Sequence, residues 1–352
     1  MSFLRYSLIA VLTAMGLYAI MIFGTSLLFN GLKLSRQLDT GSLRSDAFFG
    51  TTGELAAIYN RSALSTARPQ IILVGASNFQ KVLASEFDVP GFAVANISVD
   101  GSGLAEMERL VELADESVSP VTRGRNIFVI GVWYGPFCTV HGTVLDSLNQ
   151  QLTRYGLYRF GPDKSVVRTV PRSLLLPALT AIRPLLVEQR VWGSLEDAGR
   201  SFARFEIFGD AGPVTVDQMA QNNVTVDVAD RQKLIEERKA MCTQIDPANF
   251  VMLDQIVDRI TRNGDRAIIV DLPIPQWHAD GVPMFAVYQR EKAQGFSAAL
   301  SHEGASYLDL QSSLRDEDFY DSVHPRPLAA TKLSHLIGKA SIERDGLRQT
   351  AQ

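Results

Sequence analysis

Short apolar runs alternate with stretches of helical spacing over most of the chain beyond residue 68. Residues 104–115 and 250–262 carry apolar side chains at helical intervals, and Asn263-Gly264 marks the end of the second stretch. Strands that alternate with helices predict an α/β fold with a doubly wound parallel sheet, which binds ligands at the carboxyl ends of its strands. The runs with the composition of buried strands are residues 71–74, 92–95, 127–130, 267–270 and 306–308.

The longest apolar segment lies near the amino terminus. Residues 6–29, from Tyr6 to Phe29, contain no charged side chain, and they are long enough to cross a hydrocarbon core of about 30 Å. We therefore expect a membrane helix here, between a cytoplasmic tail at residues 1–5 and a juxtamembrane stalk at residues 30–68. A cleaved signal peptide is the alternative. Basic residues are enriched on the cytoplasmic side of membrane helices, so the three that follow this segment slightly disfavour an outward-facing domain: Lys33, Arg36 and Arg44.

A long gap separates the third apolar run from the fourth. Residues 136–246 far exceed a crossover connection, so we expect an insertion within a domain that covers residues 69–340. Helical patterns occur inside it at residues 174–187 and 228–241. Such an insertion usually forms a lid, a substrate wall or a partner surface. The mostly polar residues 341–352 are expected to form a tail.

Composition excludes two classes of protein. With 352 residues, of which 46% are apolar and 20% charged, the chain can bury a full core and is not disordered. The net charge is −4 and no basic cluster forms a phosphate-binding face, so we expect no nucleic-acid partner. The two cysteines, Cys138 and Cys242, suit a reducing or an oxidising compartment, and their spacing leaves open whether they form a disulfide.

Ser77 lies where the first predicted strand turns into a helix. The strand precedes Gly75-Ala76-Ser77-Asn78, and residues 79–83 follow with helical spacing. The first N–H groups of a helix have no intrahelical partner, so an anion that forms beside Ser77 meets donors already in place. The alternative role for this serine is that of a helix N-cap without chemistry.

Asp321 and His324 supply what a serine nucleophile requires. A base must take the hydroxyl proton, and a carboxylate must hold the other nitrogen of that imidazole. Of the five histidines, only His324 has an aspartate three residues before it, and Pro325 favours a loop over a helix there. A solvated turn is the alternative. Because Ser77 follows the first strand and the pair follows the last, the order predicts a catalytic triad.

These motifs resemble those of the SGNH (GDSL-like) hydrolase superfamily. Ser77 matches the block I serine, Gly101 falls on the block II glycine, and Asp321 with His324 matches block V. The resemblance covers about residues 71–336 and leaves out the insertion. It implies a flavodoxin-like parallel sheet in an α/β/α sandwich, with main-chain N–H groups of Ser77 and Gly101 in an oxyanion hole and with no cofactor.

Block III departs from the pattern of that superfamily. Gly131-Val132-Trp133-Tyr134 stands where the pattern has Gly-x-Asn-Asp, so Trp133 takes the place of the asparagine. One side-chain donor of the oxyanion hole is therefore missing, and removing such a donor typically costs about 10²–10³-fold in rate. Asn78, Tyr134 or a backbone N–H are the available substitutes, and we include Asn78 in the expected oxyanion hole.

Four ring-bearing side chains are expected to line the substrate pocket. Trp133 and Tyr134 follow the third strand, and Trp277 and His278 follow the fourth. Trp277 is suited to stack on a sugar ring or a thin acyl arm. Packing in the core or beneath the insertion is the alternative for the aromatic residues. We expect no metal, because the histidines lack a third ligand at suitable spacing.

The resemblance also implies a function. Anchored, outward-facing proteins of this type act on envelope polymers, as do the families that transfer D-alanine to teichoic acid or O-acetylate exopolysaccharides. We therefore expect a membrane-anchored, periplasmic serine esterase or O-acyltransferase that acts on O-acyl groups of an envelope glycan or polymer. Its expected partner is a membrane-bound O-acyltransferase. The alternative is a catalytically decayed scaffold that assists such an acyltransferase.

Overall fold

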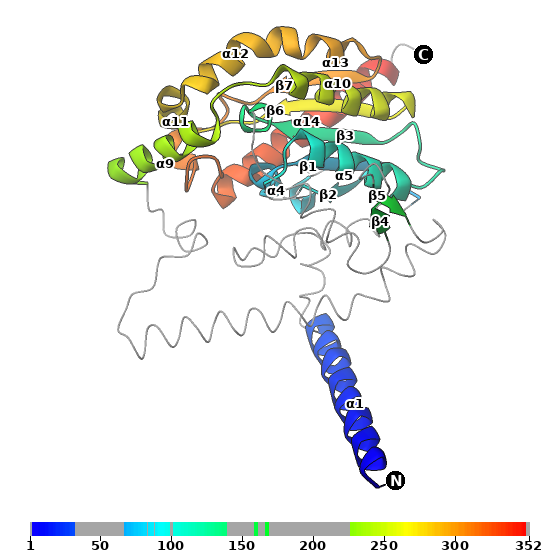
Figure 1. Cartoon of the computed structure of the whole chain (residues 1–352). Coiled ribbons are helices and arrows are strands. Elements are labelled where there is room, and N and C mark those ends of the chain that lie inside the picture. The colour runs from blue at the N-terminus through cyan, green and yellow to red at the C-terminus, as the bar shows by residue number, and fades with distance from the viewer. Residues whose placement is uncertain are drawn as a thin grey trace.

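The computed structural model describes much of the chain, and Figure 1 shows the described elements in colour. Nearly all of the stalk expected at residues 30–68, and the helical pattern at residues 174–187, lie outside the described residues. The described residues are 2–31, 67–82, 84–87, 89–98, 101–138, 158–160, 166–168 and 226–349.

A five-stranded sheet lies at the centre of the domain, in the order β2-β1-β3-β6-β7. All neighbouring strands in it are parallel. Each strand overlaps one of the predicted apolar runs, which confirms the expected α/β fold with a parallel sheet. The strands are β1 (Gln70–Gly75), β2 (Ala93–Asn96), β3 (Ile127–Val132), β6 (Arg266–Asp271) and β7 (Ala305–Asp309).

The strand order reverses direction between β1 and β3. The chain adds β2 on one side of β1 and then crosses back, so that β3 pairs with the other side of β1. Gly75 at the end of β1 is in register with Gly131 in β3. The connections that leave β1 and β3 therefore separate at the same edge of the sheet, which is where doubly wound sheets bind ligands.

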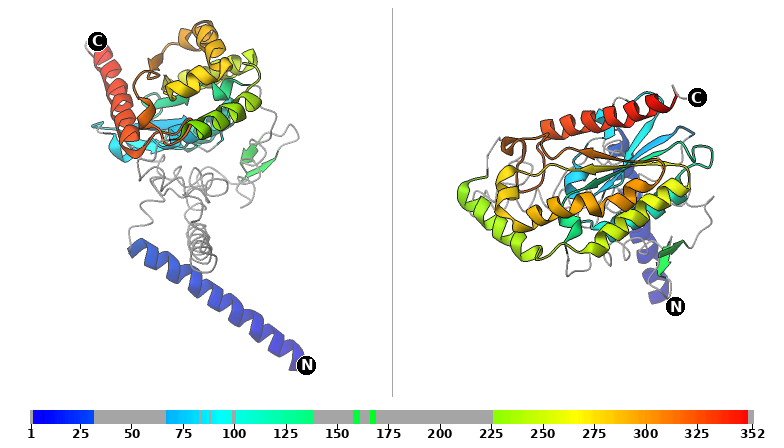
Figure 2. Two further views of the ribbon diagram at one scale, coloured as in Figure 1. Left: turned by 90° about the vertical axis from the view of Figure 1, so that its left-hand side faces the viewer. Right: turned by 90° about the horizontal axis from the view of Figure 1, so that it is seen from above.

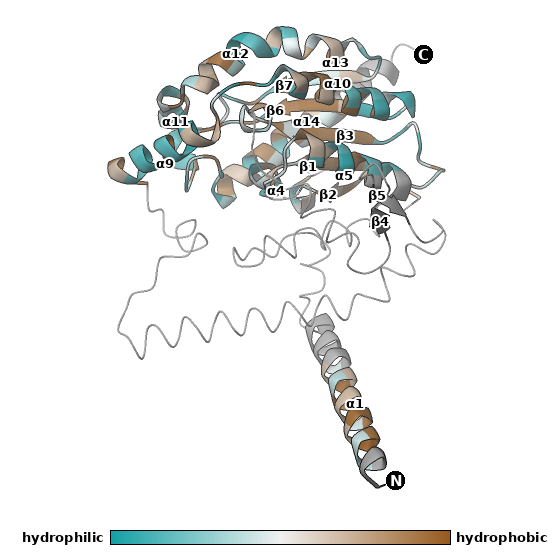
Figure 3. Cartoon of the chain, in the orientation of Figure 1, coloured by the Kyte–Doolittle hydropathy of each residue, from teal (hydrophilic) through white to brown (hydrophobic). Residues whose placement is uncertain are grey.

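Helices cover both faces of the sheet. Figure 2 shows α14 (Pro327–Gln349) on one side of the sheet and α10 (Pro247–Arg262) with α12 (Pro283–Gly295) on the other. In Figure 3 the central strands β3 and β6 are hydrophobic, whereas α9 (Val228–Met241) is mostly hydrophilic. Other elements of the domain are α5 (Leu104–Ser117) and the short α4 (Ser77–Gln80), η2 (Ala84–Glu86), η3 (Gly135–Phe137), α11 (Gln276–Gly281), α13 (Ser297–Ser301) and η4 (Asp316–Asp318).

Helix α10 illustrates how local sequence sets an element. Asp246 caps it by accepting a 2.9 Å hydrogen bond from the Ala248 N–H, and Pro247 occupies its first turn. Asn263 ends it, and Gly264 follows with a positive φ of 78°. The apolar side chains of one face are buried against the sheet, which fixes the helix on it: Phe250, Leu253, Ile256, Val257 and Ile260.

The two ends of the insertion are joined by a disulfide between Cys138 and Cys242. The Asp246 N–H also donates a 2.7 Å hydrogen bond to the Phe137 carbonyl. Helix α9 (Val228–Met241) confirms the helix predicted at residues 228–241. The insertion also holds an antiparallel pair that the pattern did not predict, formed by β4 (Tyr158–Phe160) and β5 (Val166–Arg168).

The first element is a single long helix, α1 (Ser2–Gly31), which contains the apolar segment at residues 6–29. Among the described residues, no helix combines the length and the apolar character needed to span a membrane. The membrane-crossing part of the sequence prediction is therefore not supported. At the other end of the chain, α14 continues to Gln349, so the polar tail begins inside this helix.

Candidate active site

The turn that carries Ser77 depends on a close approach between β1, α4 and β3. Phe79 is fully buried beneath the turn. A Cβ atom on Gly75 would lie 2.6 Å from Phe79 Cβ and 3.0 Å from the Gly131 carbonyl oxygen, and one on Gly131 would collide with the Phe79 ring. Only glycine at both positions leaves room for this ring, which fixes α4 directly after β1. Ser77 is the first residue of that helix.

The structure brings together the three residues of the predicted triad. Ser77 Oγ lies 2.8 Å from His324 Nε2, and His324 Nδ1 lies 2.5 Å from Asp321 Oδ2. The side chains of His324 and Asp321 are 19% and 29% exposed, so solvent reaches both of them. A serine, an imidazole and a carboxylate in this order can generate a nucleophile.

Asp321 organises the turn as well as the imidazole. Its Oδ1 atom accepts hydrogen bonds from the N–H groups of Val323, at 2.8 Å, and His324, at 2.7 Å. Burial alone would raise the pKa of Asp321. The hydrogen bond and charge of His324, together with the two N–H groups, outweigh burial and hold that pKa below its ordinary value. Asp321 is therefore an ionised acceptor at neutral pH.

Tyr320 packs directly on the imidazole. Its ring is stacked on His324, with centroids 5.6 Å apart and an interplanar angle of 12°. The Tyr320 N–H also donates a 3.2 Å hydrogen bond to the His324 carbonyl. Lys81 Nζ lies 6.0 Å from the centre of the Tyr320 ring. This stack limits rotation of the imidazole, and sequence reasoning missed it because no spacing signals which ring faces His324.

The expected oxyanion-hole residues differ in what surrounds them. Gly101 is exposed and has a positive φ of 71°, in the turn before α5. Asn78 is 3% exposed, and its Oδ1 accepts a 2.9 Å hydrogen bond from the Phe79 N–H. In the part of the chain that the structure describes, Asn78 Nδ2 and Trp133 Nε1 are buried without a hydrogen-bond partner. Asn78 follows β1 and Trp133 follows β3, and both strands end at the edge of the sheet where the triad lies.

Three of the four residues expected to line the substrate pocket are buried. Trp133 is 8% exposed, Tyr134 is 1% exposed and His278 is fully buried. Their rings meet in T-shaped contacts, with centroids of Trp133 and Tyr134 4.9 Å apart and those of Tyr134 and His278 5.6 Å apart. For Trp133 and Tyr134 this agrees with core packing, the alternative weighed from the sequence. The alternative for His278 was an ordinary surface histidine, and its burial contradicts that. Trp277 is partly exposed, and the Arg231 guanidinium lies 5.6 Å from its ring centre.

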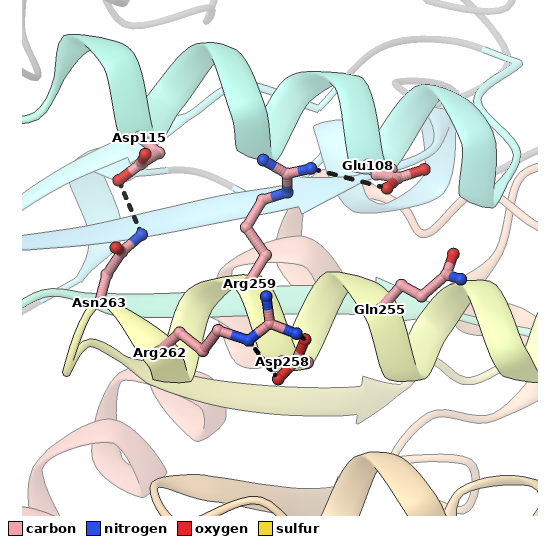
Figure 4. Close-up of a pocket in the computed structure, with 7 residues that line it drawn as sticks. All are labelled: Glu108, Asp115, Gln255, Asp258, Arg259, Arg262 and Asn263. Carbon is pink, nitrogen blue, oxygen red and sulfur yellow. Dashed lines mark hydrogen bonds and ion pairs between the residues drawn. The ribbon is translucent and has the colours of Figure 1, made fainter.

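A separate polar groove lies between α5 and α10 and is shown in Figure 4. Its charged groups are already paired with each other. Arg259 binds Glu112 at 2.9 Å, Arg262 binds Asp258, and Asn263 donates to Asp115 at 3.0 Å. Asn263 and the end of α5 lead into the amino ends of β6 and β3, so this groove lies toward the edge of the sheet opposite the triad.

The described residues contain no group of three or more His, Cys, Asp or Glu side chains placed to hold a metal ion. Comparison of the chain with models of known protein families finds no match, and comparison with curated protein sequences also finds none. The interpretation of this site therefore depends on its geometry.

Proposed function

We propose that this protein is a serine-dependent acyl hydrolase or acyltransferase with Ser77 as nucleophile. The observation that carries the proposal is the continuous contact from Ser77 Oγ to His324 Nε2, at 2.8 Å, and from His324 Nδ1 to Asp321 Oδ2, at 2.5 Å. The strand order β2-β1-β3-β6-β7 corresponds to that of flavodoxin-like sheets, and it supports the SGNH-like α/β/α architecture expected from the motifs.

In the proposed reaction, Ser77 Oγ attacks the carbonyl carbon of an ester or thioester while His324 Nε2 takes its proton. The tetrahedral oxyanion is held by N–H groups, for which Ser77, Gly101 and the unpartnered Asn78 amide are the candidates. Collapse expels the alcohol or thiol, which receives the proton from His324, and leaves an acyl-serine. Water or a glycan hydroxyl then attacks this ester, with His324 as base, and restores Ser77.

The setting of the reaction is part of the same proposal. The Cys138–Cys242 disulfide is typical of proteins in oxidising compartments and supports an extracytoplasmic location. An O-acyl group on an envelope glycan or polymer is the substrate class that the motif resemblance implies. A membrane-bound O-acyltransferase as partner, and a place at the inner membrane, stay predictions from that resemblance.

A fluorophosphonate probe tests the proposal, because it modifies a serine that a neighbouring base activates. We expect the purified wild-type chain to be labelled, and Ser77→Ala to abolish labelling without loss of the folded state. Ser297→Ala is the matched control, since Ser297 begins the surface helix α13 and lies outside the triad. Labelling of Ser77→Ala at the wild-type rate would exclude Ser77 as the nucleophile.

The second candidate is a decayed, non-catalytic scaffold. The observation in its favour is the tryptophan at position 133, where the related motif carries an asparagine donor. This candidate predicts that the wild type is not labelled and that Ser77→Ala keeps every activity of the cell that depends on the protein. The same labelling experiment therefore separates the two candidates.

A further inference from the structure

His278 is fully buried, yet both of its ring nitrogens are engaged. Its Nδ1 atom lies 2.5 Å from the Ser322 carbonyl oxygen, and its Nε2 atom lies 2.6 Å from the Tyr134 hydroxyl. Ser322 is the residue directly after Asp321 and two before His324. The imidazole therefore contacts the main chain of the turn that carries two of the three triad residues.

The direction of each hydrogen bond follows from elementary chemistry. A carbonyl oxygen only accepts, so Nδ1 of His278 carries a proton and donates it to Ser322. Burial lowers the pKa of His278 to about 4, an effect to which the charge of Arg238 adds and which the Ser322 bond and Asp321 oppose. The ring is therefore neutral at pH 7. Its Nε2 atom has no proton and accepts a hydrogen bond from the Tyr134 hydroxyl.

The bond to His278 differs from the hydrogen bonds that form within this loop. Asp321 accepts the N–H groups of Val323 and His324, and the Arg326 N–H donates to the Asp318 carbonyl at 2.7 Å. These bonds join residues of one loop and hold its shape. The His278–Ser322 bond instead joins that loop to α11, as does a 2.5 Å hydrogen bond from the Gln276 N–H to Asp316 Oδ1. Of these two bonds, only the one at His278 ends on the residue next to Asp321, and through Tyr134 it continues to the segment that follows β3.

Three strand ends meet at this connection. Tyr134 follows β3, His278 lies in α11 after β6, and Ser322 lies in the loop after β7. Ser77 follows β1 at the same edge, because parallel strands end together there. A shift of the turn relative to β3 and β6 would change the distance between His324 and Ser77. A bond that keeps the turn in place relative to β3 and β6 therefore affects the geometry of the triad without any contact to the substrate.

We propose that His278 is a positioning residue. It donates a hydrogen bond to the Ser322 carbonyl and so holds the Asp321–His324 turn where His324 Nε2 is within hydrogen-bond distance of Ser77 Oγ. Tyr134 holds His278 in the tautomer that can make this bond. The inference rests on the proposed function, because it assigns His278 a role in the activity of that same triad. It replaces the expectation that His278 contacts substrate.

The test compares rate constants for fluorophosphonate labelling in variants that are folded at the assay temperature, as judged by circular dichroism. His278→Leu keeps apolar volume and removes the donor, and we expect labelling to fall by about 10²-fold, the typical cost of a 1 Å misplacement. His278→Asn retains an N–H near the position of Nδ1, so it should be labelled faster than the Leu variant. The labelling rate of Tyr134→Phe should be about 2–10-fold lower than that of the wild type, which corresponds to the loss of one ordinary hydrogen bond.

His302→Asn is the matched control. His302 binds Asp254 through Nε2 at 2.7 Å on the surface between α13 and α10, so its loss should leave labelling at the wild-type rate. A role limited to stability would lower the melting temperatures of the His278 variants but leave labelling of the folded molecules unchanged. Tyr134→Phe keeps the ring in place and provides a second measurement if His278→Leu does not fold.

The outcomes separate this inference from the proposed function. If the wild type is labelled and folded His278→Leu is labelled equally fast, the positioning role is wrong and the proposed function stands. Equal losses in the Asn and Leu variants would contradict the role of the Nδ1–H bond. If the wild type is not labelled at all, the proposed function fails and the inference fails with it. A labelling rate that decreases from the wild type to His278→Asn and then to His278→Leu supports both the proposed function and the positioning role.

Discussion

Asp321 holds both the imidazole of His324 and the main chain of the turn that carries it. One carboxylate oxygen contacts His324 Nδ1, and the other accepts two main-chain N–H groups of the same turn. The carboxylate therefore fixes the imidazole tautomer, with the proton on Nδ1 and the lone pair on Nε2 toward Ser77. That arrangement is the one in which His324 can accept the hydroxyl proton.

We predict that Asp321→Asn retains the fold but loses most of the activity. An amide at this position can donate to His324 Nδ1 and favour the wrong tautomer, and a comparable change in a serine protease triad costs about 10⁴-fold. The rate of fluorophosphonate labelling, measured beside Asp309→Asn as a surface control, checks this. Labelling within a few-fold of the wild type would contradict the role of Asp321.

The pH dependence of stability gives a second readout of the same carboxylate. Because the pKa of Asp321 is lower in the folded chain than its ordinary value of 3.8, ionisation stabilises the fold. This contribution is present above the unfolded pKa and is lost as the pH falls through the folded pKa. In acid unfolding, Asp321→Asn should therefore show a weaker decrease in stability below about pH 4 than the wild type.

The three triad residues could be predicted from the sequence because their order along the chain, serine after the first strand and Asp-x-x-His after the last, carries the information. Tyr320 and His278 could not be assigned in this way. Stacking on His324 and a bond to the Ser322 carbonyl depend on which side chains meet in space, and neither has a spacing signature. For Trp133 the sequence left core packing and a pocket wall open, because burial is decided by tertiary packing.

Among the elements, the contact between β1, β3 and α4 gives a test of packing. We predict that Gly131→Ala destabilises the domain by about 1–3 kcal/mol, because the added methyl group overlaps the Phe79 ring in a filled core. Gly338→Ala is the control. Its Cβ would lie 3.4 Å from Phe87 Cδ1, an ordinary contact, and alanine favours the helix.

Denaturant unfolding of both variants measures the difference. A Gly131→Ala domain as stable as the wild type would mean that α4 does not require this close approach. Because α4 carries Ser77, the same variant should also be labelled more slowly by the probe.

The parallel strands were predictable because buried strands in such sheets are continuous apolar runs, and residues 71–74 and 267–270 are clear examples. Helix α10 was predictable because its apolar period and its Asn263-Gly264 end agree. The pair β4 and β5 was not predicted. Its strands are three residues each, too short for a period to stand out in a long insertion.

For the whole molecule, the disulfide between Cys138 and Cys242 closes the insertion at its base, with 104 residues of sequence separation. We predict that replacing both cysteines with serine destabilises the domain by roughly 4–5 kcal/mol, the value expected from the loop entropy of a chain this long. Thermal unfolding with and without reductant measures this. The wild type should become less stable in reductant, and the double variant should not respond.

An equal response of the wild type and the double variant to reductant would show that the bridge is not formed in solution. The sequence did not decide whether these cysteines form a disulfide, since two cysteines far apart in a chain give no sign that they are close in space. The helix expected at residues 6–29 lies within α1, but its proposed passage through a membrane found no support among the described residues.

The most direct test of the central claim is to digest the fluorophosphonate-labelled protein and identify the modified peptide by mass spectrometry. We predict a single adduct on Ser77, absent after His324→Ala because the base is then missing. Modification of a different residue, or labelling of Ser77 that is unaffected by loss of His324, would contradict the claim that these two side chains act together.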